Sequence, residues 1–246
     1  MEHLLQLTFN QGQTATAAKV SDVSALPTAL EQLGLIGSRP CLVIVGGASQ
    51  ISADDFVRIQ SLFVEVLAPI AQTCGAYVVD GGTDAGVMQL IGHARKQING
   101  EFPLVGVAPT GKVILPDQTT AVADDATPLE PNHTHFVLIS GCHWGDESPW
   151  LVEVATVLSG DAPSVTILLN GGEITFLDAA NSVNAGRLVM AIAGSGRTAD
   201  KLASALHGNP TDERAKELAA SGKLQTIDLD AGWEKLTNTI TNLLAN

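Results

Sequence analysis

Residues 76–95, AYVVDGGTDAGVMQLIGHAR, constrain the fold more than any other stretch of the chain. The stretch begins with a β-favouring run, and apolar residues recur at helical spacing from Val87 onward. Gly81, Gly82 and Gly86 lie between these two segments, where the backbone must turn sharply or approach a ligand closely. The sequence therefore predicts a buried strand, a glycine loop and an amphipathic helix in immediate succession.

A helix that begins in a glycine loop presents unpaired N–H groups and the positive end of its dipole. This arrangement favours binding of a phosphate or a carboxylate. A Gly-Gly turn also closes strand-to-helix connections that bind nothing, so this loop alone leaves both interpretations open.

Three further apolar runs end in small residues. Residues 42–45 lead into Gly46-Gly47-Ala48-Ser49, residues 165–169 lead into Asn170-Gly171-Gly172, and residues 188–193 lead into Gly194-Ser195-Gly196-Arg197. In a parallel α/β sheet the carboxyl ends of the strands share one edge, and ligands bind in the crevice there. We therefore predict that the four loops converge.

The alternation of strands and helices predicts an α/β protein with a Rossmann-like, doubly wound and mainly parallel sheet and helices on both faces. We predict one domain over residues 1–246, in which residues 1–39 form an antiparallel appendage packed on the sheet. Residues 111–131 lack a clear period and contain three prolines, so we expect a long excursion that acts as a lid.

Charge and cysteine content narrow the classes of partner. The formal net charge of −13 argues against binding to nucleic acid or to an anionic membrane, but it allows a small anionic ligand in a local site. The three cysteines form no CxxC or paired framework, and the N-terminal residues lack signal-peptide features. With no apolar run of the ~18–20 residues that span a membrane, we expect a cytoplasmic protein.

Five motifs resemble a known family. The segments VVDGGTDAGVMQLIG, LVGVAPTG, LEPNHTHFVLI, LLNGGEIT and IAGSGRTAD, in this order, resemble the cytosolic N-terminal region of melastatin-type TRP channels and its prokaryotic, LSDAT-type relatives. These proteins belong to the SLOG superfamily of Rossmann-like domains, which includes the cytokinin-activating LOG enzymes and the DNA-processing protein DprA. The resemblance spans about residues 5–206 and implies a bacterial source.

The resemblance implies a sensor of a nucleotide-derived ligand, with ADP-ribose and its relatives as the leading candidates and no certain cofactor. The glycine loop at residues 81–86, here called the first glycine loop, would bind phosphate. Arg197 would face it, and its planar guanidinium suits a diphosphate. A solvated or ion-paired arginine is the alternative. Asn132 would contact the ribose or base, or else form a turn. The residues predicted to bind the ligand are Gly46, Gly47, Ala48, Ser49, Gly81, Gly82, Thr83, Asp84, Gly86, Pro109, Asn132, His133, Gly171, Gly172, Gly194, Ser195, Gly196, Arg197 and Thr198.

The enzymatic branch of the superfamily supplies the alternative function. LOG enzymes carry GGxGTxxE with a catalytic glutamate, whereas this chain has Ile174 at the fourth position and Asp178 at the last. A carboxylate displaced by ~1 Å can lose about a hundredfold in rate, so we expect a sensor rather than an active hydrolase. The alternative is a hydrolase that cleaves an N-glycosidic or phosphate bond of a nucleotide and uses Asp178 or Glu173. A scaffold with vestigial glycine loops is a third interpretation.

Two other chemistries are weakly indicated. Residues 194–199 fit the GxGxxG/A dinucleotide pattern, but Asp212 and Asp228 are poorly placed as its partner acid. His133 and His135, followed by the acids and thiol of residues 142–147, have a zinc-binding composition at a spacing that matches no established pattern, so we predict no metal. Homo-oligomerisation is left open.

Overall fold

The computed structural model describes residues 4–10, 12–47, 53–118 and 123–245. Its strands form a nine-stranded sheet in which β1 pairs antiparallel with β2 and each other neighbouring pair is parallel. The predicted α/β class with a mainly parallel sheet is confirmed. In sheet order the strands are β1 (Leu4–Thr8), β2 (Thr14–Val20), β8 (His135–Ile139), β5 (Leu104–Pro109), β4 (Tyr77–Asp80), β3 (Cys41–Gly46), β9 (Ser164–Leu169), β10 (Leu188–Ala193) and β11 (Leu224–Asp228).

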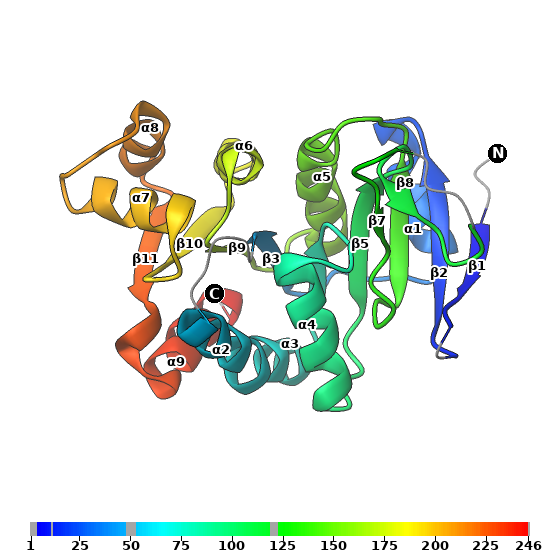
Figure 1. Cartoon of the computed structure of the whole chain (residues 1–246), viewed down its shortest axis with the longest axis horizontal. Helices are drawn as coiled ribbons and strands as arrows, with labels where there is room; N and C mark the ends of the chain where they lie inside the picture. Colours follow the sequence, from blue (N-terminus) through cyan, green and yellow to red (C-terminus); the bar gives the residue numbers. More distant parts are fainter. Residues whose placement is uncertain (1–3, 11, 48–52, 119–122, 246) are drawn as a thin grey trace.

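Helices cover both faces of the sheet, as predicted (Figure 1). Strand residues alternate between two apolar cores, so that Val43 and Val45 face one layer of helices while Leu42 and Ile44 face the other. The first layer contains α1 (Leu26–Gln32), α5 (Ser148–Ser159), α6 (Glu173–Asn184), α7 (Arg197–Leu206) and α8 (Glu213–Ala220). The second contains α2 (Ala53–Leu62), α3 (Ala68–Cys74), α4 (Gly86–Gln97) and α9 (Trp233–Ala245). In the described part of the chain, each helix is too short or too polar to cross a lipid bilayer.

The N-terminal appendage differs from its prediction in one respect. β1 and β2 form the expected antiparallel hairpin, but β2 also joins the main sheet in parallel, with Thr16 to Val20 beside His135 to Ile139. An antiparallel appendage is therefore the wrong description of β2, which is a regular strand of the large sheet.

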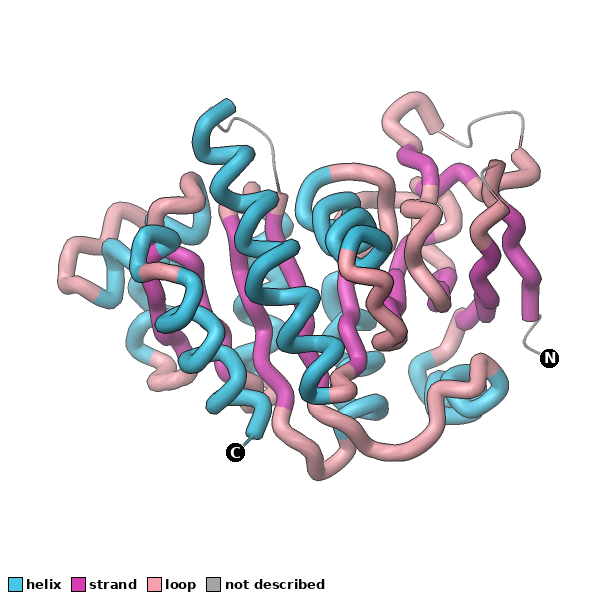
Figure 2. Tube along the Cα trace, turned by 90° about the horizontal axis from the view of Figure 1, so that it is seen from below, coloured by secondary structure: helices cyan, strands magenta, loops and turns pink. Residues whose placement is uncertain are grey.

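The chain from α2 to α3 stays helical despite a proline within α3. Residues 63–67 form a π-helical turn between the two helices, and Pro69 follows as the second residue of α3. Proline lacks the amide hydrogen of a regular helix and collides with the carbonyl four residues back. The wider π turn lies directly before that position, and Figure 2 shows the three pieces as one continuous rod across the sheet. Ser52, a residue type that favours the N-cap position, precedes α2 but lies outside the described residues.

The excursion at residues 111–131 packs against the first glycine loop. Its described part contains a short parallel pair, β6 (Val113–Ile114) and β7 (Thr127–Pro128). Farther along, Leu129 forms a bridge with Thr83, and the Glu130 amide donates to the Gly82 carbonyl at 2.9 Å. Its role as a lid stays a prediction.

Both the backbone conformation and the lack of room for a side chain require glycine at position 82. Its φ is +68°, and a Cβ there would lie 2.8 Å from the Gly106 Cα and 3.1 Å from the Phe136 ring. We expect Gly82→Ala to lower the free energy of unfolding by about 2–4 kcal/mol, because left-handed strain and a backbone clash add. Urea denaturation of Gly75→Ala is the matched control, since Gly75 has a φ of +59° with nothing within 4 Å of its Cβ position. Equal losses in the two variants would contradict the clash.

Candidate functional site

The strand order reverses between β3 and β9. From β3 the chain continues through β4, β5 and β8 on one side, whereas β9 leads to β10 and β11 on the other. At such a switch point the loops after neighbouring strands leave in opposite directions and open a crevice. A cavity of about 560 Å³ lies there.

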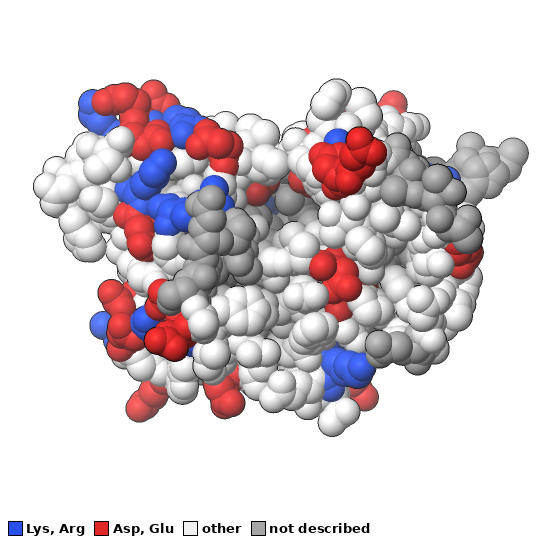
Figure 3. All heavy atoms as spheres, in the orientation of Figure 1, with Lys and Arg blue, Asp and Glu red and all other residues white. Residues whose placement is uncertain are grey.

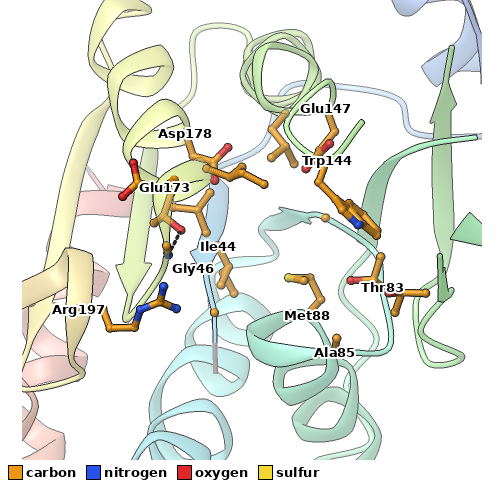
Figure 4. Close-up of a pocket in the computed structure, with 18 residues that line it drawn as sticks. Ile44, Gly46, Thr83, Ala85, Met88, Trp144, Glu147, Glu173, Asp178 and Arg197 are labelled. Atoms are coloured by element: carbon orange, nitrogen blue, oxygen red, sulfur yellow. Dashed lines mark hydrogen bonds between the residues drawn. The ribbon is translucent and has the colours of Figure 1, made fainter. Parts of the chain in front are cut away.

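The walls of this cavity, here called the switch-point pocket, come from both halves of the sheet. Figure 4 shows Arg197 on one side and Trp144 with Thr83 on the other, with Asp178 and Glu147 along a third side. The lining residues are Ile44, Val45, Gly46, Gly47, Gly81, Thr83, Ala85, Met88, Thr127, Trp144, Glu147, Leu151, Gly172, Glu173, Ile174, Thr175, Asp178 and Arg197.

Hydrogen bonds join the glycine loop after β9 to the glycine loop after β10, next to Arg197. The Asn170 amide donates to Ser195 Oγ at 2.9 Å, and Asn170 Nδ2 donates to the Ser195 carbonyl at 2.9 Å. Thr198 Oγ1 donates to the Gly172 carbonyl at 3.1 Å. The loops after β9 and β10 therefore form one rigid wall, because the groups that join them are buried.

Arg197 takes its position through this wall and through the missing side chain of Gly172. Its Nη2 atom lies 3.1 Å from the point that a Cβ of Gly172 would occupy. Arg197 itself has a φ of +49°, which is uncommon for a residue other than glycine. The guanidinium thus lies against the loop that begins α6.

Helix N-termini border the pocket. The residue before α4 is Ala85 and the residue before α6 is Gly172, and both line the cavity. The N-terminal, positive dipole ends of these helices therefore lie at its edge. Helix α6 begins at Glu173 and α7 begins at Arg197, and both of these residues line the pocket.

Two carboxyl groups in the pocket, those of Asp178 and Glu147, have raised pKa values. Burial raises the pKa of Asp178 to about 7, aided by the charge of Glu147 and opposed by the Ser148 hydroxyl, which donates at 2.5 Å. Burial and the neighbouring Asp146 charge also raise the pKa of Glu147, against the opposing hydrogen bond from the Gly145 amide. The pocket can therefore hold an acid near neutral pH.

The raised pKa of Asp178 predicts that stability falls as pH rises from about 4 to 7. Folding lifts this pKa from 3.8 to about 7, so the folded chain binds more protons than the unfolded chain across this window. We expect Asp178→Asn to flatten the profile and to raise unfolding stability at pH 8 by about 2–4 kcal/mol. Urea titrations at pH 5 and pH 8 test this. Exposed Asp161→Asn is the control, and an unchanged slope in Asp178→Asn would contradict the prediction.

Glu173, the other candidate acid, has a different environment. It is exposed and forms an ion pair with Arg214, with Nη1 to Oε2 at 2.6 Å, and hydrogen bonding from Arg214 lowers its pKa. It belongs to charges of both signs that gather over α7 and α8 (Figure 3). Glu173 is therefore ionised at neutral pH and poorly suited to donate a proton.

A buried charged network lies behind the first glycine loop. His133 bridges two fully buried carboxylates, with Nε2 at 2.8 Å from Asp80 and Nδ1 at 2.8 Å from Glu130. Burial lowers the pKa of His133, but the two carboxylates outweigh it and raise the pKa to about 9. Asp80 also accepts the Gly82 amide at 2.7 Å, and Asn132 donates to Glu130 at 2.8 Å and 2.5 Å. Protonated His133 therefore stabilises the first glycine loop through Asp80, which binds the Gly82 amide.

The structure divides the predicted site residues into three groups. Gly46, Gly47, Gly81, Thr83, Gly172 and Arg197 line the pocket together with both candidate acids, Asp178 and Glu173. Ala48 and Ser49 lie outside the described residues. The others are not among the residues that line it: Gly82, Asp84, Gly86, Pro109, Asn132, His133, Gly171, Gly194, Ser195, Gly196 and Thr198.

Trp144 and Glu147 are pocket residues that sequence reasoning missed. They lie on the loop between β8 and α5, whose acids resemble an ordinary helix start. A tryptophan in a loop directly after a strand was the signal available, because such loops gather at the carboxyl edge.

The doubly wound sheet and the pocket at its switch point define a Rossmann-like α/β protein. Residues 39–238 match the family model described as SLOG in TRPM, prokaryote, and the chain belongs to this family. This confirms the resemblance carried by the motifs.

Animal TRPM channels are among its relatives. The chain is 28% identical to transient receptor potential cation channel subfamily M member 2 of Mus musculus over 197 residues and 26% identical to that of Rattus norvegicus, covering 65% of this chain and 13% of each channel. A subfamily M member-like 2 protein of Nematostella vectensis is 29% identical over 140 residues, which are 47% of this chain and 9% of that protein. The match thus spans a small part of these channels.

Proposed function

We propose that this protein senses a nucleotide-derived ligand, with ADP-ribose as the leading candidate, in the switch-point pocket. The observation that carries the proposal is that glycine loops from both halves of the sheet and Arg197 line one cavity. Its volume of about 560 Å³ lies within the usual size of a small-molecule site. The diphosphate would take the amides at the starts of α4 and α6 and the Arg197 fork.

The remaining lining supports the other parts of such a ligand. Trp144, Met88 and Ile44 offer apolar surface to a base. Glu147 and Asp178 offer carboxyl oxygens to ribose hydroxyls, which donate well to such acceptors. The pocket therefore has complements for the base, the sugar and the phosphates.

Membership of this family supports the sensor proposal but does not identify the ligand. The relatives that match this chain are cation channels. The family model covers residues 39–238, which include the pocket-lining segments. A domain related to part of a channel suits a sensor whose output passes to a partner. We propose a cytoplasmic location for this sensor, without nucleic-acid or membrane binding.

Thermal unfolding against ADP-ribose, cyclic ADP-ribose, NAD, AMP and ATP tests the proposal. A ligand at a hundred times its dissociation constant should stabilise the fold by ~2.7 kcal/mol, a shift of several degrees for a chain of this size. A shift with one of these ligands supports the sensor. No shift with any of them would remove the adenine-nucleotide assignment.

Hydrolysis of an N-glycosidic bond is the second candidate function, favoured by the two buried acids of the pocket. One carboxyl would protonate the departing base, while the other, as carboxylate, would take a proton from the water that attacks the anomeric carbon. Chromatography of ADP-ribose and NAD after long incubation would detect the released base or ribose product. Turnover that is lost in both Asp178→Asn and Glu147→Gln favours the enzyme, and intact ligand favours the sensor.

A further inference from the structure

The loop between β8 and α5 brings together three side chains of different chemistry. Cys142, His143 and Asp146 place a thiol, an imidazole nitrogen and a carboxylate oxygen within 4.8 Å of one another. The same loop contributes Trp144 and Glu147 to the switch-point pocket. This cluster, here called the rim cluster, thus lies on the loop that forms one pocket wall.

The sequence spacing predicted no metal here, but from the positions of these side chains in the structure we propose that the rim cluster is a zinc site. The Cys142 Sγ lies 3.3 Å from His143 Nδ1, which in turn lies 3.8 Å from Asp146 Oδ2. A tetrahedral zinc with bonds of about 2.3 Å to sulfur and about 2.0–2.1 Å to nitrogen and oxygen separates its ligand atoms by about 3.4–3.6 Å. The observed separations bracket these values, so small side-chain rotations suffice to bind the ion.

The loop backbone holds the carboxylate in place for this role. Asp146 Oδ2 accepts hydrogen bonds from the backbone amides of Cys142 and His143, each at 2.9 Å. Gly141 allows the close fit, because a Cβ there would lie 2.9 Å from Asp146 Oδ2. The loop therefore holds the carboxylate near the thiol and the imidazole.

The donor set selects the ion. Sulfur and imidazole nitrogen suit zinc and its borderline-soft neighbours, whereas magnesium and calcium prefer oxygen ligands throughout. Cys142 loses its thiol proton when it binds zinc, since only the thiolate is a ligand. Three protein ligands leave a fourth position for water, and the His143 side chain is 79% exposed.

A second cluster in the described residues provides the contrast. Asp84, His93 and Glu130 also lie within 4.8 Å of one another, but the Glu130 oxygens already accept hydrogen bonds from Asn132 and contact His133. This set has no sulfur and its buried acid is committed elsewhere. His93 is therefore a suitable histidine for a control variant.

Cobalt titration tests the rim cluster. The untagged full chain, stripped with a chelator, should bind one Co²⁺ with a sulfur-to-cobalt charge-transfer band, and Zn²⁺ should displace it. Cys142→Ser should abolish the band, while Cys74→Ser should retain it, because Cys142 is the exposed one of the three cysteines. His143→Ala and Asp146→Asn should each weaken zinc binding by at least about tenfold, and His93→Ala should not.

Two results would overturn the proposal. One is wild-type protein that binds Zn²⁺ no more tightly than Mg²⁺ in competition with a chromophoric chelator, a measurement that needs no variant. The other is a charge-transfer band that persists in Cys142→Ser. Circular dichroism of each variant separates lost binding from lost folding, and every titration uses metal alone, so the result does not depend on the nucleotide ligand.

Discussion

Replacing His133 with alanine should lower the free energy of unfolding by about 3–5 kcal/mol at pH 6. The substitution removes the cation between Asp80 and Glu130, both fully buried, and leaves two carboxylates without their shared partner. Breaking a buried ion pair from one side costs this much because the remaining charge stays desolvated. The Gly82 amide bond to Asp80 should loosen as well, so the first glycine loop loses its support.

The effect of His133 should depend on pH in a defined direction. Its pKa rises from 6.5 in the unfolded chain to about 9 in the folded chain, so its contribution is complete below 6.5 and is lost as pH rises through 9. The gap between wild type and His133→Ala in urea denaturation should therefore shrink between pH 6 and pH 10. Exposed His207→Ala is the control. A loss below about 1 kcal/mol at pH 6, or a gap that grows with pH, would show that His133 is not a buried cation.

Arg197→Ala should weaken ADP-ribose binding by about 10- to 100-fold, if the ligand occupies the switch-point pocket as proposed. Hydrogen bonds to charged groups contribute about 1.5–3 kcal/mol each, and a guanidinium can make two to one diphosphate. Among the described lining residues Arg197 supplies the positive charge, while Glu173 is an ionised acid. Its loss should therefore matter more than that of any surface lysine.

Isothermal titration of three variants distinguishes this role from general electrostatics. Lys201→Ala removes a cation from the same helix that does not line the pocket, so it should change the affinity less than about threefold. Arg197→Lys keeps the charge but loses the planar fork, so it should lie between Arg197→Ala and wild type. Equal affinities in Arg197→Ala and Lys201→Ala would mean that the phosphates bind elsewhere.

The sheet was the most predictable part of the fold. Strands buried on both faces read as unbroken apolar runs, and residues 42–45, 165–169 and 188–193 lie in β3, β9 and β10. The starts of α6 and α7 were less predictable, because their N-caps are Gly172 and Gly196, which have no side chain to mark a cap. The pairing of β2 with β8 also lacked a local signal, since it joins residues more than a hundred positions apart.

The part of the site that could be predicted from the sequence is the part formed by loops at the carboxyl edge of the sheet. Gly46, Gly81 and Gly172 line one cavity because parallel strands end together, and this follows from the strand pattern alone. His133 is different: a polar residue before a strand can face a ligand or a buried acid, and its partner Asp80 lies 53 positions earlier. Trp144 and Glu147 reach the pocket because of how one loop packs, and no periodic sequence pattern indicates that packing.

The switch point between β3 and β9 has a consequence for local opening of the sheet. One pocket wall comes from the half that ends with β3 and the other from the half that begins with β9, and the two halves share a single strand pairing along residues 41–46 and 164–169. A ligand that touches both walls would oppose every fluctuation that separates these strands. Amide hydrogen exchange along β3 and β9 would then slow together upon binding, while exchange at β1 and β11, the outer strands, would stay unchanged.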